Sequence, residues 1–114
     1  MVQRMGMVIG LKQDRIQEYK KLHAHSWPEL NNALWTAGIR NYSIFLKEPE
    51  NLLFGYWEYV GNDFDADMAS LRSLKMTKRW LELTDPCQQR LSSASVGEWW
   101  SFMEPVYHLQ ETSE

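Results

Sequence analysis

Four stretches of the chain alternate or run apolar over the length of a β-strand. Residues 5–11 form the first, a short apolar run. Residues 41–47 and 52–60 flank a Glu-Pro-Glu-Asn segment, which predicts a turn and hence an antiparallel hairpin. Residues 98–109 form the last predicted strand, and Pro105 within it favours a sheet edge or a bulge.

The longer segments between these strands have helical character. Residues 15–37 follow Asp14, a residue that favours the first position of a helix. Pro28 lies inside this segment, and a proline there should kink the helix or restart it. Ser26 or Trp27 could then cap the restarted piece.

A second helical segment covers residues 63–84 and can divide into two pieces around residues 71–73. Asp85-Pro86 ends it, and residues 85–97 are rich in Gln and Ser, which predicts a loop. The order of elements is β-α-β-β-α-β. This is the ferredoxin-like α+β pattern, a four-stranded antiparallel sheet with both helices on one face.

The predicted last strand carries large apolar side chains on both faces. Trp99 and Met103 fall on one face, and Trp100 and Phe102 on the other. Two helices in so small a chain can cover only one face of the sheet, and a strand that is apolar on both faces is buried on both. The simplest cover for the second face is another copy of the chain, which predicts a homodimer.

Composition narrows the classes of function. The 114 residues are expected to form one domain, residues 1–114. The net charge of −3 lacks the basic stripe that nucleic-acid binding or an anionic membrane surface requires, so neither partner is expected. A signal peptide and a long apolar run are also missing from the sequence, which makes the cytoplasm the expected location.

Cysteine and histidine spacing predicts neither a disulfide nor a metal site. Cys87 is the single cysteine, and we interpret it as an incidental loop thiol. The three histidines have no zinc-ligand spacing with it. We therefore expect no metal site.

The most informative motif is an aromatic and imidazole series near the N-terminus. Tyr19, His23 and Trp27 recur every four residues, a spacing that places side chains on one face of a helix. Such a stripe is often simply core. An imidazole that titrates near neutral pH between rings with polar edges also suits a small hydroxyl-rich ligand that exchanges protons.

Three separated blocks of sequence resemble the L-rhamnose mutarotase family. The first is Tyr-x3-His-x3-Trp-Pro-Glu-Leu, which begins at Tyr19. The second is Asn-Tyr-Ser-Ile-Phe-Leu from residue 41, followed by Asn-Leu-Leu-Phe from residue 51. The third is Lys-Arg-Trp, which ends at Trp80, with Thr-Asp at residues 84–85. The resemblance covers most of the chain and implies a mutarotase-like domain and a dimeric α/β barrel.

The resemblance also implies roles for four residues. His23 matches the proton donor, Tyr19 and Tyr42 match sugar-binding tyrosines, and Trp80 matches the first residue of a tryptophan pair that packs on the sugar. The second residue of that pair is Leu81 here, so we expect a changed pocket wall and a shifted preference among 6-deoxyhexoses. The implied reaction is cofactor-free interconversion of the α and β anomers of L-rhamnose or a related sugar.

Other assignments stay open from sequence. Glu29 is a weak candidate for a base, and His25 and His108 are more easily interpreted as structural or solvated. Two alternative functions remain: a cofactor-independent monooxygenase on the same dimeric barrel, and a non-catalytic sugar or small-ligand sensor. Fold alone cannot choose among them.

Overall fold

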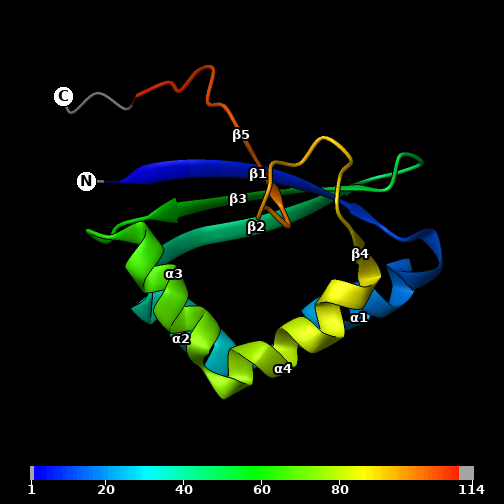
Figure 1. Ribbon diagram of the computed structural model, residues 1–114, viewed down its shortest axis with the longest axis horizontal. Helices are drawn as coiled ribbons and strands as arrows, with labels where there is room; N and C mark the ends of the chain where they lie inside the picture. Colours follow the sequence, from blue (N-terminus) through cyan, green and yellow to red (C-terminus); the bar gives the residue numbers. More distant parts are fainter. Residues whose placement is uncertain (1, 111–114) are drawn as a thin grey trace.

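The computed structural model describes residues 2–110 and contains one antiparallel sheet. The three long strands are β1 (Gln3–Leu11), β2 (Ile39–Lys47) and β3 (Leu52–Tyr59), in the order β2-β3-β1. The short strands β4 (Gln88–Gln89) and β5 (Ser101–Met103) both pair with the remaining edge of β1 (Figure 1). Two separate pieces of chain therefore share the fourth position of the sheet.

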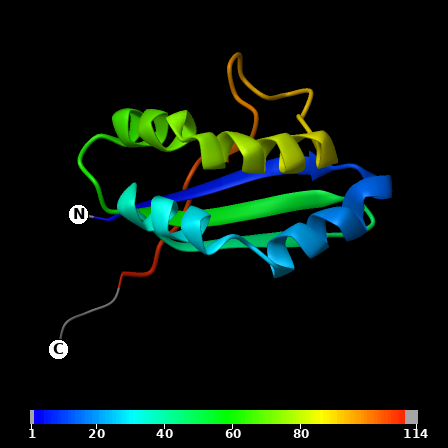
Figure 2. The same cartoon turned by 90° about the horizontal axis from the view of Figure 1, so that it is seen from below.

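Four helices lie on one face of this sheet (Figure 1, Figure 2). They are α1 (Ile16–Ala24), α2 (Pro28–Thr36), α3 (Phe64–Ser73) and α4 (Lys75–Thr84). The predicted ferredoxin-like β-α-β-β-α-β arrangement is confirmed, with each predicted helix in two pieces. None of the helices between residues 2 and 110 has the length and apolar character needed to span a bilayer.

The helix breaks follow the sequence signals closely, with one correction. Trp27 caps α2, and Pro28 takes its first position, where the missing N–H has no helical partner to lose. Asp14, in contrast, lies inside a short 3-10 turn (Gln13–Arg15), and Arg15 is the residue that precedes α1. The prediction that Asp14 caps the first helix is therefore wrong.

A β-bulge interrupts the pairing of β2 with β3. Arg40 pairs with Glu58, but the next pair joins Ser43 with Tyr56, so two residues of β2 oppose one of β3. Asn41 takes the left-handed conformation, with φ of 52°, and its side chain donates to Glu58. An extra residue reverses which face the following side chains occupy. The bulge thereby turns Tyr42 toward the helices, on the same face of the sheet as Ile44 and Leu46.

The last strand is much shorter than the sequence predicts. Residues 88–89, predicted as loop, form β4, whereas only residues 101–103 of the predicted strand 98–109 form β5. Residues 104–110 continue as irregular chain, starting beside Pro105, which has no N–H to give to a ladder. The two-sided pattern holds for two residues: Phe102 lies near Phe64 on the helix side, and Met103 lies on the opposite face beside Gly6.

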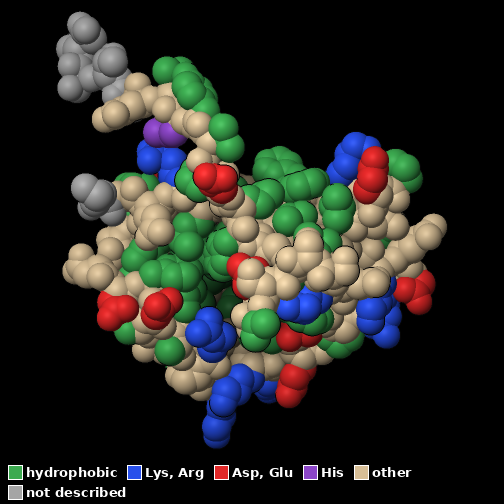
Figure 3. Space-filling view, turned by 45° about the horizontal axis from the view of Figure 1, so that its top comes forward, with side chains coloured by type: hydrophobic (Ala, Val, Ile, Leu, Met, Phe, Trp, Pro, Cys, Tyr) green, Lys and Arg blue, Asp and Glu red, His purple; other side chains and the backbone are tan. Residues whose placement is uncertain are grey.

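The core lies between the sheet and the helices. One cluster centres on Ile9, Leu53 and Cys87, and a second on Ile39, Tyr59 and Met68. The opposite face of the sheet is not covered by helices. It carries Val8, Phe45, Leu52, Phe54, Tyr56 and Met103, as the strand register shows. Phe45 is 65% exposed, and Figure 3 shows hydrophobic side chains gathered over this side of the molecule.

Candidate active site

A cavity of about 620 Å³ opens between the helices and the sheet. Cavities of roughly 300–1,000 Å³ are typical of small-molecule sites, so a six-carbon sugar fits. Its walls come from α1, α2 and α4 on one side and from the first three strands on the other. The apolar lining includes Leu11, Leu30, Leu34, Ile39, Ile44, Leu46, Leu53 and Trp80, and the polar lining includes Tyr19, Lys20, His23, Ser26, Asn31 and Tyr42.

Tyr19 and His23 lie together on α1, as their spacing predicts. Their ring centroids are 4.2 Å apart. Nδ1 of His23 lies 2.9 Å from the carbonyl oxygen of Tyr19. A carbonyl only accepts, so Nδ1 carries a proton, and the neutral ring has its lone pair on Nε2. The nitrogen that is left for a ligand in the cavity is therefore a proton acceptor in the neutral ring.

The environment of His23 favours this neutral state. Burial lowers the pKa of the imidazole below its usual value of 6.5, and the hydrogen bond to the Tyr19 carbonyl opposes part of that change. At neutral pH the ring can thus take a proton first and give it back later.

The two tyrosines keep their protons. Burial raises the pKa of Tyr19 to about 12, although a hydrogen bond from Gln88 lowers it in part. Burial of its hydroxyl also raises the pKa of Tyr42, and the nearby Tyr19 adds to the rise. Tyr42 is still partly exposed, and its ring packs edge-on against that of Trp57, with the ring centroids 5.0 Å apart. Both hydroxyls are neutral groups that can donate to sugar oxygens.

Trp80 packs between His23 and Trp27, the last residue of the aromatic series. Its ring is buried, lies 5.3 Å from His23 and 5.2 Å from Trp27, and lines the cavity. Trp27 follows α1 rather than continuing its stripe, yet reaches the same cluster through Trp80. Leu81 lies outside the set of described residues that line the cavity. The expectation that Leu81 forms a pocket wall is therefore wrong, because the next residue of a helix points to another side.

The other open candidates lie away from the cavity. His25 is on a separate surface groove with Lys21 and Trp27, and Glu29 is exposed. His108 belongs to the exposed chain after β5. Among residues 2–110, none of the side chains that line the cavity is a carboxylate, and no three His, Cys, Asp or Glu residues group as a metal site.

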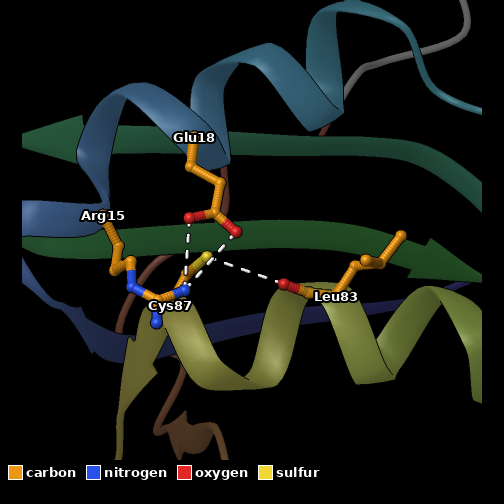
Figure 4. Close-up of polar contacts among 4 residues, drawn as sticks. All are labelled: Arg15, Glu18, Leu83 and Cys87. Carbon is orange, nitrogen blue, oxygen red and sulfur yellow. Dashed lines mark hydrogen bonds and ion pairs between the residues drawn. The ribbon is translucent and has the colours of Figure 1, made fainter.

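Cys87 is not the loop thiol that the sequence indicated. It is fully buried, and its Sγ lies 3.6 Å from the carbonyl oxygen of Leu83 (Figure 4). Burial raises the pKa of the thiol, which disfavours the nucleophilic thiolate. The nearby Arg15 and Glu18 form an ion pair at 3.2 Å. Cys87 therefore belongs to the core, whereas the ion pair beside it is exposed.

Sequence reasoning missed several groups that the fold brings to the site. Asn31 and Trp35 reach the cavity from α2, and Lys20 from α1. Gln88 touches the hydroxyl of Tyr19 from β4, at a sequence separation of 69 residues. The period of α2 could have identified Asn31, since it follows Trp27 by four residues. Gln88 lies in a polar stretch that gives no such signal.

Comparison with known proteins gives a family for this arrangement. A curated protein of Dictyostelium discoideum, described as a UPF0734 protein, is 38% identical over 82% of this chain and 78% of its own length. The L-rhamnose mutarotase of Lactiplantibacillus plantarum is 34% identical over 95% of this chain and 83% of its own. The crystal structure of an L-rhamnose mutarotase from Formosa agariphila superposes with a TM-score of 0.75 at 25% identity, over 95% of this chain and 99% of that one.

The fold itself is more widely distributed. A putative antibiotic biosynthesis monooxygenase from Nitrosomonas europaea matches with a TM-score of 0.58 at 11% identity, over 90% of this chain and 86% of that one, a likeness of fold alone. The family model for L-rhamnose mutarotase, in contrast, matches residues 4–109. The chain therefore belongs to the L-rhamnose mutarotase family.

Proposed function

We propose that this protein interconverts the α and β anomers of L-rhamnose, with His23 as the group that moves the proton. The observation that carries the proposal is the 2.9 Å hydrogen bond between Nδ1 of His23 and the Tyr19 carbonyl, which leaves Nε2 for the ligand. Family membership supplies the substrate, and the cavity supplies the neutral hydroxyl groups of Tyr19 and Tyr42 beside the imidazole.

The proposed reaction needs one proton to move between two oxygens of the same carbon. Nε2 of neutral His23 accepts the proton of the anomeric hydroxyl. The bond between C1 and the ring oxygen then breaks, the aldehyde forms, and the imidazolium donates the proton to the former ring oxygen. Rotation about the C1–C2 bond presents the other carbonyl face, and the reverse steps close the ring. His23 is thus the proton donor in ring opening, after it has been the acceptor.

The remaining site residues hold the sugar in this scheme. Tyr19 and Tyr42 donate hydrogen bonds to the oxygens on which negative charge develops, and their raised pKa values keep them protonated at neutral pH. Trp80 packs against the apolar C–H face or the 6-methyl group. In this scheme His23 takes both proton-transfer roles, since Tyr19 and Tyr42 keep their protons and the described lining of the cavity contains no carboxylate.

The test is anomeric exchange measured by saturation-transfer NMR with L-rhamnose, L-fucose and D-glucose. We expect His23→Ala to lower the exchange rate by about 10²-fold or more, the usual contribution of positioned proton transfer. His25→Ala is the matched control, because it removes the neighbouring imidazole outside the cavity. Equal rates in the two variants would show that His23 is structural. Ligand binding without faster exchange in the wild type would indicate a sugar sensor instead.

We also propose that the protein acts as a homodimer in the cytoplasm. One surface of the sheet points away from the helices, and its apolar side chains support the dimer, since such a surface is usually covered. Two such sheets facing one another would make the α/β barrel. A single cysteine, present as a buried thiol, is compatible with a reducing compartment.

A further inference from the structure

Gln88 is the buried centre of a short chain of hydrogen bonds behind the cavity. Gln88 lies in β4 and pairs with Leu11 of β1, and only 4% of the residue is exposed. The indole Nε1 of Trp99 donates to Oε1 of Gln88 at 2.6 Å, and Nε2 of Gln88 donates to the hydroxyl oxygen of Tyr19 at 3.1 Å. Gln88 and Trp99 lie behind the lining residues of the cavity, whereas Tyr19 is one of them.

The direction of each bond follows from the chemistry of the groups. An indole N–H can only donate, so the amide of Gln88 must turn its oxygen toward Trp99. The amide nitrogen then faces Tyr19 and can only donate to it. The Tyr19 hydroxyl oxygen is therefore an acceptor on this side, and its own proton is free to be donated elsewhere. Because Tyr19 lines the cavity, a ligand in the cavity can accept this proton.

We propose that Gln88, oriented by Trp99, is a positioning residue that makes Tyr19 a hydrogen-bond donor to the bound sugar. If the amide were reversed, its oxygen would accept the hydrogen bond from the Tyr19 hydroxyl. The sugar would then face only the acceptor lone pair of that hydroxyl. Trp99 thus sets the polarity of a contact that it does not itself make. The inference rests on the proposed function for the identity of the sugar. The donor and acceptor directions of the two hydrogen bonds do not depend on it.

Two variants reverse this polarity in different ways. Gln88→Glu keeps the shape and the bond from Trp99 and, with its carboxyl ionised, offers only acceptor oxygens to Tyr19. Trp99→Phe removes the indole N–H, so that the amide is free to turn. The second variant guards against loss of folding, because Trp99 is 39% exposed and tolerates a smaller ring. Trp100→Phe is the matched control, since Trp100 packs on the core cluster that contains Tyr19 but takes no part in these hydrogen bonds.

The first readout is binding of methyl α-L-rhamnopyranoside, a locked anomer that cannot exchange, measured by NMR titration beside the exchange rate with L-rhamnose. We expect Trp99→Phe to weaken binding about 5- to 10-fold, the scale of one hydrogen bond. The exchange rate per unit of free substrate should fall at least as far. Trp100→Phe should change both by less than about 2-fold.

The second readout is the phenol Cζ resonance of Tyr19 in protein labelled with ¹³Cζ-tyrosine, assigned with Tyr19→Phe. Donation by the phenol moves Cζ toward its phenolate position, so Trp99→Phe and Gln88→Glu should shift it that way, and Trp100→Phe should not. Equal resonances and equal affinities in wild type and Trp99→Phe would overturn the proposal. If the wild type neither binds nor exchanges rhamnose, the proposed function fails, and the Cζ shift still decides whether Gln88 and Trp99 set the polarity of Tyr19.

Discussion

The chemistry of His23 depends on one hydrogen bond within its own helix. The Tyr19 carbonyl that receives Nδ1–H belongs to the residue four positions earlier, so the Tyr-x3-His spacing sets both the shared face and the tautomer. A backbone carbonyl or a carboxylate commonly orients such a histidine. Here a helix of nine residues is sufficient.

This arrangement predicts a rate profile that extends below the usual titration of histidine. The pKa of His23 is lowered by burial, so the neutral acceptor form persists as the pH falls through 6.5. Exchange of L-rhamnose anomers, corrected for the protein-free rate, should stay level from about pH 8 to 6.5 and fall only at lower pH. Measured between pH 4.5 and 8, an inflection above 6.5 would contradict this environment for His23. His25→Ala should leave the profile unchanged.

The site residues differ in how much of their role could be predicted from the sequence. Tyr19 and His23 are linked by helical spacing, so their proximity is a local property. Tyr42 required a family resemblance, because strict alternation from Ile39 assigns it to the face opposite the helices. Gln88 depends on a contact between β4 and α1, which no local pattern encodes.

At the scale of elements, the bulge in β2 controls which face of the sheet Tyr42 occupies. Asn41 adopts a positive φ there, a conformation that a β-branched residue strongly disfavours. Asn51, in the turn before β3, has a similar φ of 57° but lies away from the cavity. The two asparagines form a matched pair for separating strain from function.

We expect Asn41→Val and Asn51→Val to lower the free energy of unfolding by similar amounts, about 1–2 kcal/mol each. Only Asn41→Val should also lower anomeric exchange, by about 10- to 100-fold, because relief of the strain moves Tyr42. Denaturant unfolding and NMR exchange measure the two effects. Asn41→Gly tolerates the positive φ and should stay near wild-type activity. Equal activity losses at positions 41 and 51 would show that the bulge has no special role.

The elements that could be predicted are those with a local chemical signal. Pro28 marks the start of α2, and the turn before residue 52 marks the hairpin. The strand β4 could not be predicted, because it consists of two glutamines that pair with β1 through backbone groups. Apolar residues beyond β5 indicated a long strand, but their exposure shows that a single copy of the chain gives them nothing to pack against.

At the scale of the whole molecule, the sheet has one face covered by helices and one apolar face without them. Phe45 lies in the C-terminal part of β2 on the second face and is 65% exposed. Leu83, on α4, is 41% exposed on the helical side. A dimer that forms through the sheets buries Phe45 and leaves Leu83 in solvent.

We therefore expect the wild type to sediment as a dimer at micromolar concentration, Phe45→Lys as a monomer, and Leu83→Lys as a dimer. A charge buried without a partner at the interface costs several kcal/mol, whereas a charge on an exposed helix costs little. Sedimentation velocity distinguishes the three proteins. A wild type that is monomeric at this concentration, or a dimeric Phe45→Lys, would exclude pairing through the sheet.

The split edge of the sheet has a consequence for divergence among related chains. The segment from Arg90 to Trp100 begins and ends on the same strand, β1, so its two anchor points stay together whatever its length. Arg90 closes it locally by donating to the carbonyls of Ala94, Ser95 and Glu98. Insertions there would lengthen a closed loop at a small entropic cost, which rises only with the logarithm of its length. This segment is where the chain can gain new surface without moving α1, as long as Trp99 keeps its hydrogen bond to Gln88.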